Sequence, residues 1–369
     1  MISVFGSNVG SKEILAVQEC MESQWMGFGQ KVLDFEEKFK SHVKLENFAM
    51  VDSGSNALYM AISLLNLPKQ SEIILPSFTW VSCAQAVLLA GHKPVFCDVD
   101  LNTMNIRLED IEPHISQKTA AIMVVHYAGK PVDVDPIKEL GFPIIEDAAH
   151  AVDSYYNGKI CGSLGDIGIY SFDAVKNLTV GEGGGITAKD RKLIERAEVM
   201  RYCGIGKSGF DAARGGKTQL WWEYNIKEPF IKMLPTNIAA SIGIVQLERL
   251  DELQLSRKSI WKRYQKAFAE DEWIIRPQEP SGNETHSYFT YAIRTPKRNQ
   301  LAKYLLEKEI YTTLRYHPLH LNALYNCKTR LPNCEQLNVD CLSIPLHPNL
   351  TEDQVAFIIE SILNFKRYV

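Results

Sequence analysis

Strand-like and helix-like segments alternate along the chain from residue 55 to residue 151, and this alternation constrains the fold more than any other feature. Apolar strand-like runs lie at 72–76, 93–100, 119–129 and 142–151, and helix-like runs lie at 55–66 and 81–91. The pattern predicts an α/β fold with a mostly parallel sheet flanked by helices. In such sheets, ligands bind beyond the carboxyl ends of the strands. We therefore look for chemistry at or just after strand ends: Asp98, His126, Asp147 and the stretch 170–185.

The second half of the chain predicts a smaller domain. An amphipathic helix is expected at 190–202, and the long helical stretch 236–270 is expected to join the large domain to the smaller one. The elements expected after it are a strand at 287–295, a helix at 296–308, a strand at 310–316 and a helix at 351–365. We therefore predict a large domain over residues 1–250 and a smaller C-terminal α+β domain over residues 251–369.

Composition and charge narrow the classes of function. The formal net charge of −4 shows no basic excess, so nucleic acid is not expected as a partner. No apolar run approaches the roughly 20 residues that span a bilayer, and the N-terminal "MISVFGSNVG" lacks a signal-peptide pattern. We therefore expect a cytoplasmic protein without membrane attachment. The 8 cysteines form no CxxC pair, which favours reduced, mostly buried thiols over a metal site.

One lysine stands out within "YSFDAVKNLTVGEGGG" at residues 170–185. Lys176 follows an apolar strand-like run, has apolar neighbours on both sides, and precedes four glycines within residues 181–185. A lysine in apolar surroundings has its pKa lowered by desolvation, which makes the amine a nucleophile toward carbonyls. A nucleotide-type phosphate loop is excluded, because that motif places its glycines before the lysine and a helix after it. Glycines after the lysine instead allow a sharp turn close to a bulky cofactor.

A pyridine aldehyde cofactor would need three further features, and each has a counterpart in the sequence. A carboxylate must keep the ring nitrogen protonated, and Glu146 and Asp147 end an apolar strand-like run. A phosphate group needs backbone N–H groups at a helix start, which residues 53–56 supply. A flat ring needs an aromatic face, and Trp80 follows the strand-like run 72–76. Taken singly, the aspartate is equally typical of a helix cap, and the serines are typical of an ordinary N-cap.

Together these motifs resemble the DegT/DnrJ/EryC1/StrS sugar aminotransferases, which are pyridoxal phosphate enzymes of the aspartate aminotransferase fold. The resemblance covers most of the chain, including 237–251 and 315–320. The five segments that carry it are "SGSNAL" (53–58), "PSFTW" (76–80), "EDAAH" (146–150), "SFDAVK" (171–176) and "GEGG" (181–184). A fold type I transferase, with a mostly parallel mixed sheet in its large domain, is therefore expected.

The resemblance implies a role for each matching residue. Lys176 would be the Schiff-base lysine and proton shuttle, and Asp147 would pair with the pyridine nitrogen. His150 would hydrogen-bond the ring hydroxyl, and Trp80 would stack on the ring. The residues that would hold the phosphate are Gly54, Ser55 and Ser171. A branch of dehydratases in the family carries histidine in place of the Schiff-base lysine, so the lysine of this chain favours amino transfer.

Two positions depart from the family pattern. Family members commonly carry an asparagine before the helix that starts near residue 237, where it reaches the cofactor phosphate of the partner subunit. This chain has "PFIKMLPTNIAA" (229–240) there, so Lys232 or the earlier Asn225 would have to supply that contact. The position after "SF" is often histidine and is Asp173 here, which is expected to alter substrate contacts.

The expected reaction transfers an amino group from L-glutamate, through pyridoxal 5'-phosphate, to a nucleotide-linked keto sugar. "VVHYAG" (124–129) resembles the branch that acts on 4-keto sugars, which points to a 4-keto-6-deoxyhexose, with a 3-keto sugar as the alternative. The resemblance also implies a homodimer with shared active sites. Two further alternatives are a dehydratase that uses pyridoxamine phosphate and a non-catalytic regulator with a retained fold.

Candidate substrate contacts lie at one strand end, in a glycine-rich segment and in the second domain. His126 is expected to contact the sugar from its strand end. Because the net charge is negative, a diphosphate would need a local cluster of cations. The candidate cations are Arg201, Lys207 and Arg214 in a glycine-rich segment that suits a mobile loop, together with Arg315 and His317 in "RYHPLH" (315–320).

Overall fold

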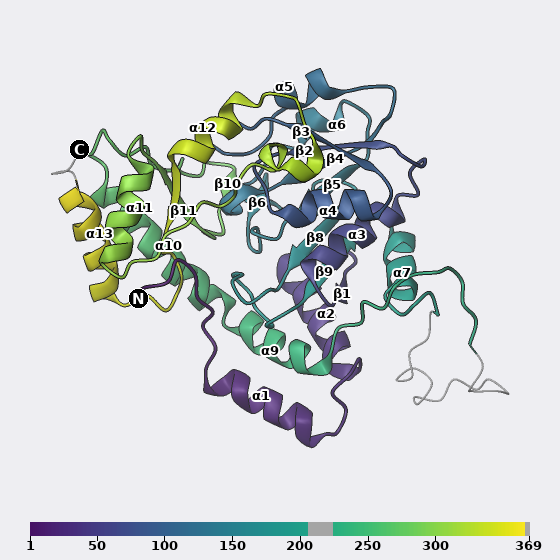
Figure 1. Cartoon of the computed structure of the whole chain (residues 1–369). Helices are drawn as coiled ribbons and strands as arrows, with labels where there is room; N and C mark the ends of the chain where they lie inside the picture. Colours follow the sequence, from purple (N-terminus) through teal and green to yellow (C-terminus); the bar gives the residue numbers. More distant parts are fainter. Residues whose placement is uncertain (206–223, 366–369) are drawn as a thin grey trace.

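The centre of the larger lobe is a seven-stranded sheet in the order β1-β9-β8-β5-β4-β2-β3 (Figure 1). The computed structural model describes residues 1–205 and 224–365. The strands of this sheet are β1 (Ala49–Val51), β2 (Glu72–Pro76), β3 (Lys93–Cys97), β4 (Thr119–Val125), β5 (Ile144–Asp147), β8 (Ile167–Ser171) and β9 (Gly184–Ala188). β3, β2, β4, β5 and β8 run parallel, whereas β9 pairs antiparallel with both β8 and β1. The predicted mostly parallel mixed sheet is confirmed.

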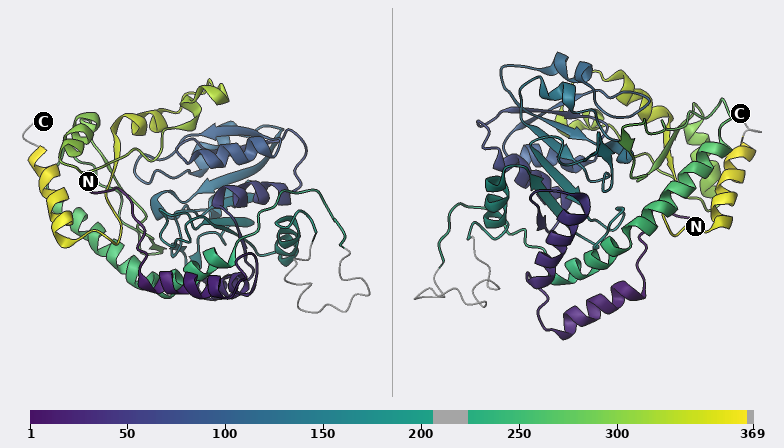
Figure 2. Two further views of the ribbon diagram at one scale, coloured as in Figure 1. Left: turned by 60° about the horizontal axis from the view of Figure 1, so that its bottom comes forward. Right: turned by 180° about the vertical axis from the view of Figure 1, so that it is seen from behind.

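Helices flank this sheet, as the alternation in the sequence predicts (Figure 2). The longer ones are α1 (Ser11–Glu22), α2 (Gln30–Val43), α3 (Gly54–Leu64), α4 (Val81–Leu89), α7 (Arg191–Met200) and α9 (Asn237–Glu248). α3 packs against α4, β8 and β9, while α1 and α2 both pack against α9. β5, β8 and β9 are buried along their whole lengths, as is usual for the central strands of a sheet that helices cover on both faces.

Shorter elements connect these layers. They are α5 (Leu108–Ile111), α6 (Asp135–Lys138), β6 (Tyr155–Tyr156), β7 (Lys159–Ile160), β10 (Glu284–Thr285) and α12 (Pro332–Asp340), with 3₁₀ turns at Glu112–His114, Tyr127–Gly129, Leu319–Leu321 and Ala323–Tyr325. β10, β6 and β7 form a small antiparallel sheet. This sheet links the segment after β5 to the C-terminal part of the chain.

A second hydrophobic core lies in the C-terminal part of the chain. Its elements are α10 (Leu250–Ala267), β11 (Tyr291–Arg294), α11 (Arg298–Glu307), β12 (Cys341–Ile344) and α13 (Glu352–Phe365). α10 spans both cores, because Leu250 packs in the first core and Trp261 in the second. Leu337 in α12 packs with the first core, so the C-terminal part of the chain contributes to both. The division into domains 1–250 and 251–369 stays a prediction.

The strand expected at 310–316 is wrong. The segment forms only isolated bridges, from Ile310 to Ile2 and from Thr313 to Ser343. A strand needs successive residues paired along one neighbour, and here each end meets a different segment. The apolar side chains of this segment, such as Ile310, thus pack without a strand ladder.

The long helical stretch predicted at 236–270 consists of two helices. The backbone at Arg249 turns to φ −103° and ψ 0°, which separates α9 from α10. Within the described part of the chain, no helix combines the length and the apolar character needed to cross a bilayer.

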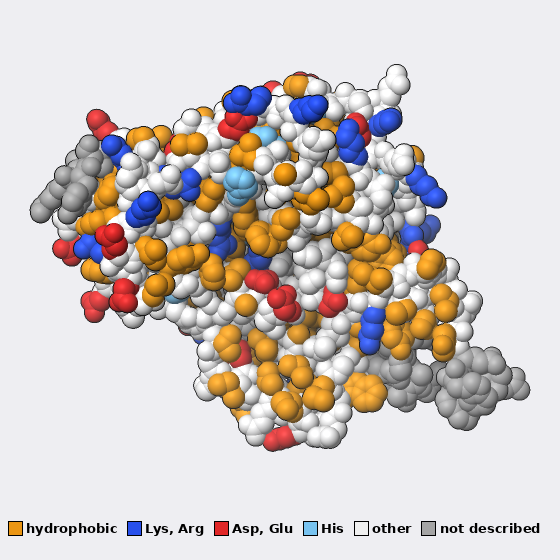
Figure 3. Space-filling model, in the orientation of Figure 1, with side chains coloured by type: hydrophobic (Ala, Val, Ile, Leu, Met, Phe, Trp, Pro, Cys, Tyr) orange, Lys and Arg blue, Asp and Glu red, His pale blue; other side chains and the backbone are white. Residues whose placement is uncertain are grey.

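Large apolar side chains remain exposed on α1 and on the segment that leads into α9. Ile14, Leu15 and Met21 on α1 are 65%, 54% and 50% exposed. Ile226 and Ile231, before α9, are 60% and 56% exposed. Figure 3 shows apolar side chains gathered on the lower lobe, which carries α1 in the matching view of Figure 1. Single exposed apolar side chains are ordinary, but a group of them marks a surface suited to a protein partner.

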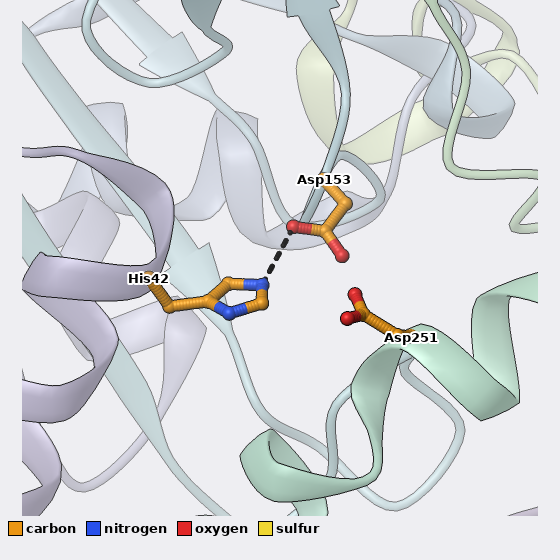
Figure 4. Close-up of side chains that lie close together, drawn as sticks. All are labelled: His42, Asp153 and Asp251. Atoms are coloured by element: carbon orange, nitrogen blue, oxygen red, sulfur yellow. Dashed lines mark hydrogen bonds and ion pairs between the residues drawn. The ribbon is translucent and has the colours of Figure 1, made fainter.

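An ion pair between α2 and the segment after β5 lies beside the start of α10 (Figure 4). His42, near the end of α2, has its Nε2 3.1 Å from Oδ1 of Asp153, and Asp251 at the start of α10 lies beside them. The hydrogen bond to Asp153 raises the pKa of His42 against the opposing effect of burial, and the charge of Asp251 adds to the increase. A protonated His42 thus supplies the positive charge that the two neighbouring carboxylates need.

We expect His42→Gln to lower the free energy of unfolding by about 0.5–1 kcal/mol at about pH 6, as is usual for a partly exposed ion pair. Because the folded-state pKa of His42 is raised, the stabilisation is complete below the pKa of the unfolded histidine and is lost as the pH rises through the folded-state value. Urea unfolding of wild type and variant between about pH 6 and about pH 9 should therefore show a shrinking difference.

His114→Gln is the matched control, because burial lowers rather than raises the pKa of His114. A difference between wild type and His42→Gln that stays constant over the whole pH range would contradict the ion pair.

Candidate active site

The start of α3, the end of β8 and the start of β9 meet at one place. Ser53 caps α3 by accepting a hydrogen bond from the N–H of Asn56 at 3.2 Å. A Cβ added at Gly54 would lie 2.7 Å from the Cβ of Ser171. A Cβ added at Gly184 would lie 2.4 Å from the carbonyl carbon of Ser53, so both positions require glycine. The resulting cradle presents the first N–H groups of α3, which lack acceptors inside the helix and suit a phosphate group.

Three hydroxyl groups lie at or beside this cradle. Ser55, exposed in the first turn of α3, has its Oγ 2.7 Å from the Oγ of Ser82 in the first turn of α4. Ser171 ends β8, and its Oγ accepts a hydrogen bond from the N–H of Asp173 at 3.4 Å. The structure therefore brings Ser55 and Ser171 next to Gly54. Ser82 was missed by sequence reasoning, although it lies just after Trp80, which was selected.

Lys176 lies on the turn that follows β8. Its Nζ is 4.9 Å from the ring centroid of Phe289, and burial, followed by the charge of Arg315, lowers the pKa of its amine to about 8. The charges of Asp147 and Asp173 partly oppose this decrease. An amine with such a pKa has a substantial neutral fraction near neutral pH and can attack a carbonyl carbon. The lowered pKa predicted from the apolar surroundings is confirmed, with a neighbouring cation as a second cause.

Asp147 is the last residue of β5 and is almost fully buried. Its Oδ1 accepts a hydrogen bond from the N–H of Ala149 at 2.9 Å, and its Oδ2 accepts one from the thiol of Cys83 at 3.1 Å. Both oxygens are therefore held in place, which fixes the direction of the carboxylate. The Cys83 contact was not predicted, because nothing in the local sequence relates residue 83 to residue 147.

Glu146 forms hydrogen bonds in the protein interior and does not face this site. It is fully buried, and its Oε2 lies 2.8 Å from Nε2 of His126 and accepts a hydrogen bond from the N–H of Gly162 at 2.7 Å. His126 is also fully buried, and its Nδ1 accepts a hydrogen bond from the N–H of Val132 at 3.0 Å. Since both ring nitrogens of His126 are occupied, its expected contact with the sugar is wrong. Its place at a strand end is explained by the buried pair with Glu146.

His150 has one ring nitrogen in use and one without a partner. Its Nε2 lies 3.0 Å from the hydroxyl of Tyr316, and its ring stacks on Phe289 at a centroid distance of 4.0 Å. Burial, with the nearby charges of Lys176 and Arg315, holds the pKa of His150 well below its usual value, so the imidazole is neutral. Nδ1 is buried and has no hydrogen-bond partner among residues 1–205 and 224–365. A buried nitrogen of this kind can hydrogen-bond a bound ligand or a water molecule.

The exposed ring of Trp80 lies against Tyr316, which in turn stacks on the imidazole of His150. Trp80, at the start of α4, is 53% exposed, and its ring lies 5.3 Å from the ring of Tyr316. The face of Trp80 is thus available to cover a flat ring beside His150. Tyr316 and Phe289 were missed by sequence reasoning, although Tyr316 lies inside the "RYHPLH" segment that was singled out.

The two cations predicted in the "RYHPLH" segment, Arg315 and His317, lie in different surroundings. Arg315 is 7% exposed, and its Cζ lies 4.8 Å from the centroid of Phe289, so it shares that ring with Lys176. His317 is exposed, and its Nδ1 lies 2.9 Å from Oδ1 of Asn338. The structure therefore brings Arg315 to Lys176 and places the side chain of His317 with α12.

Arg201 is not available to a substrate. It is buried, pairs with Glu36 at 2.5 Å and donates to the carbonyl oxygen of Met50 at 2.7 Å. Its guanidinium thus serves the packing of α2 against β1, and its expected contact with a diphosphate is wrong. Lys207 and Arg214 lie outside the described residues.

The arrangement fits pyridoxal 5'-phosphate. The cradle of Gly54 and Ser171 matches the phosphate, and the buried Nδ1 of His150 matches a ring hydroxyl. The fixed carboxylate of Asp147 matches the ring nitrogen, and the amine of Lys176 matches the aldehyde. Fold and site together define the class of fold type I pyridoxal phosphate enzymes.

The DegT/DnrJ/EryC1/StrS aminotransferase family model matches residues 7–363 of the chain. The chain is 34% identical over 364 residues to the dTDP-4-dehydro-2,3,6-trideoxy-D-glucose 4-aminotransferase of Saccharopolyspora spinosa, covering 96% of this chain and 94% of the relative. It is 31% identical over 370 residues to the spore coat polysaccharide biosynthesis protein SpsC of Bacillus subtilis, covering 96% and 94%.

Solved structures agree with these relatives. The aminotransferase TlmJ from Streptoalloteichus hindustanus superimposes with a TM-score of 0.94 at 34% identity, covering 100% of this chain and 99% of that one. A putative sugar aminotransferase from Streptococcus pneumoniae in its PLP form gives 0.91 at 26% identity, covering 99% and 98%, and was also solved in a PMP form. The chain belongs to the DegT/DnrJ/EryC1/StrS aminotransferase family and is a pyridoxal-phosphate-dependent sugar aminotransferase.

Proposed function

We propose that this enzyme moves the amino group of L-glutamate to C4 of a nucleotide-linked 4-keto-6-deoxyhexose. The observation that carries the amino-transfer chemistry is the grouping of three side chains: a lysine with a lowered pKa, a fixed carboxylate and a buried imidazole with a free nitrogen. The relative from Saccharopolyspora spinosa is named for a dTDP-linked 4-dehydro sugar and for amination at C4, which supports the substrate class and the position.

Pyridoxal phosphate, when bound, supplies a ring that draws electrons away from the bond being broken. The residues of the chain would orient the cofactor and transfer the proton. Asp147 would hold the ring nitrogen protonated, and His150 would donate from Nδ1, because its Nε2 accepts from Tyr316 in that tautomer. Nζ of Lys176 would carry the proton between the two carbon atoms of the exchange, a task suited to an amine whose pKa lies near the working pH.

Arg315 is our candidate for an anionic group of the substrates. Its guanidinium lies beside the aromatic rings of Phe5 and Phe289 and next to Lys176, where it is held in a nearly buried position. A guanidinium in this setting suits either the carboxylate of glutamate or a phosphate of the nucleotide. His317 is proposed as a second contact, which would come from the exposed side of the same segment.

A homodimer with shared active sites is part of the proposal. The exposed apolar side chains of α1 and of the segment before α9 supply a surface for a second copy. That segment also passes the phosphate cradle, because the carbonyl oxygen of Met233 accepts a hydrogen bond from the N–H of Asp52 at 3.1 Å. Lys232 and Asn225 are exposed on it, so either could reach the phosphate bound by a partner subunit.

The test is to incubate the holoenzyme with L-glutamate and a matched panel of nucleotide-linked 3-keto and 4-keto sugars. Mass spectrometry and NMR of the products identify the amino sugar and the aminated carbon, and Lys176→Ala serves as the inactive control. We expect 2-oxoglutarate and the 4-amino sugar. A clear preference for a 3-keto sugar would overturn the C4 assignment, and loss of a hydroxyl group without amination would overturn the aminotransfer.

A further inference from the structure

Cys83 lies behind the carboxylate proposed to face the ring nitrogen. Its Sγ is 3.1 Å from Oδ2 of Asp147 and 3.2 Å from Oγ1 of Thr79. All three side chains are buried, with exposures of 0%, 5% and 1% for Cys83, Asp147 and Thr79. Since Cys83 has one hydrogen to give, it donates to Asp147 and accepts from Thr79. A hydrogen-bonded chain thus runs from the start of α4 to the end of β5.

The thiol is kept in the form that can donate. Burial, and then the charge of Asp147, raise the pKa of Cys83 well above its usual value, so the sulfur carries its proton at every physiological pH. A thiol is also a weak donor compared with a hydroxyl or an N–H group. It therefore holds Asp147 in place while withdrawing little of the negative charge on the carboxylate.

The first turn of α4 reaches several parts of the site. Trp80 begins the helix with its exposed ring, Ser82 lies with its hydroxyl on Ser55, and Cys83 supports Asp147. These positions fall within one helical turn, where neighbouring side chains point in different directions. The turn therefore connects the ring face, the phosphate cradle and the carboxylate through a single rigid element.

We infer that Cys83 is a positioning residue: its S–H group fixes the orientation of Asp147, so that one carboxylate oxygen stays directed at the ring nitrogen with most of its charge. This inference rests on the proposed role of Asp147. Because the protonated ring nitrogen draws electrons from the lysine-linked end of the cofactor, it also lowers the apparent pKa seen in the absorbance of bound pyridoxal phosphate. That apparent pKa reports on Asp147 separately from turnover.

Two variants test the inference on the holoenzyme. Cys83→Val keeps the approximate volume and removes the donor, whereas Cys83→Ser keeps a donor. We expect Cys83→Val to lower kcat about tenfold with little change in KM, and to raise the apparent pKa of the bound cofactor. We expect Cys83→Ser to stay within about threefold of wild-type kcat and close to the wild-type apparent pKa.

The matched control is Cys97→Val, because Cys97 is also fully buried but lies at the end of β3 beside other acids. Cys97→Val should leave the apparent pKa of the bound cofactor unchanged even if it lowers stability. Thermal unfolding of each apoprotein shows whether a variant loses stability, which distinguishes that effect from a misplaced Asp147 carboxylate. If Asp147→Asn changes the apparent pKa but Cys83→Val does not, the inferred role of Cys83 is overturned and the proposed role of Asp147 stands. If Asp147→Asn does not move it either, the proposed role of Asp147 fails first.

Discussion

Lys176→Ala is expected to reduce turnover by roughly four orders of magnitude or more, because one amine would both attach to the cofactor aldehyde and carry the proton of the exchange. Cofactor affinity should fall much less, since the phosphate cradle of Gly54 and Ser171 and the side chain of His150 would keep their contacts without the lysine side chain. Steady-state assays and a fluorescence titration with pyridoxal phosphate measure the two effects separately.

Borohydride reduction followed by peptide mass spectrometry adds a direct readout of attachment. The cofactor mass should be found on the peptide that contains Lys176 in wild type and nowhere in Lys176→Ala. The control is Lys189→Ala, which removes an exposed lysine just after β9 and should leave rate and labelling unchanged. Turnover of Lys176→Ala near the wild-type rate would show that another group carries the proton.

Asp147→Asn is expected to lower kcat by about 10²–10³ while weakening cofactor binding by less than about tenfold. The substitution keeps the size of the side chain and the contact with Ala149, but it removes the charge that holds the ring nitrogen protonated. That charge matters most when electrons flow into the ring, so the loss falls on the rate. Pre-steady-state absorbance measurements of each half-reaction locate the loss.

Asp190→Asn is the control for Asp147→Asn, because Asp190 caps α7 at the surface and should affect stability only slightly. Wild-type activity in Asp147→Asn would contradict the assignment. Glu146 is not a ready substitute, since its carboxylate is occupied by His126 and by the N–H of Gly162.

The fold was readable from local patterns. β2 was predicted at its observed bounds, Glu72–Pro76, and α3 and α4 within two residues of theirs, because apolar runs bounded by glycine, proline and serine carry the period of their element. The strand predicted at 310–316 failed for the opposite reason. Its residues suit a strand, but whether a strand forms depends on a neighbour that lies elsewhere in the chain.

The predicted substrate residues show where local reading stops. His126 and Arg201 are residue types that could bind a sugar and a diphosphate. In the structure, however, they pair with the buried acids Glu146 and Glu36. Nothing near either residue in the sequence identifies that acid, because the partners are 20 and 165 positions away. Arg315 has an equally polar sequence neighbourhood, yet it is the cation that lies close enough to lower the pKa of Lys176.

The sequence by itself determined most of the helices and buried strands of the large lobe and the reactive lysine with its glycines, because these signals lie within a few neighbouring residues. Only the tertiary structure decided which polar groups stay free. Asp147, on strand β5, is held by Cys83 from helix α4, and His150 is held by Tyr316 from the C-terminal part of the chain. Hydrogen bonds of this range form only when folding brings α4 and the segment around Tyr316 to the carboxyl end of β5, and that end of the sheet exists only in the folded chain.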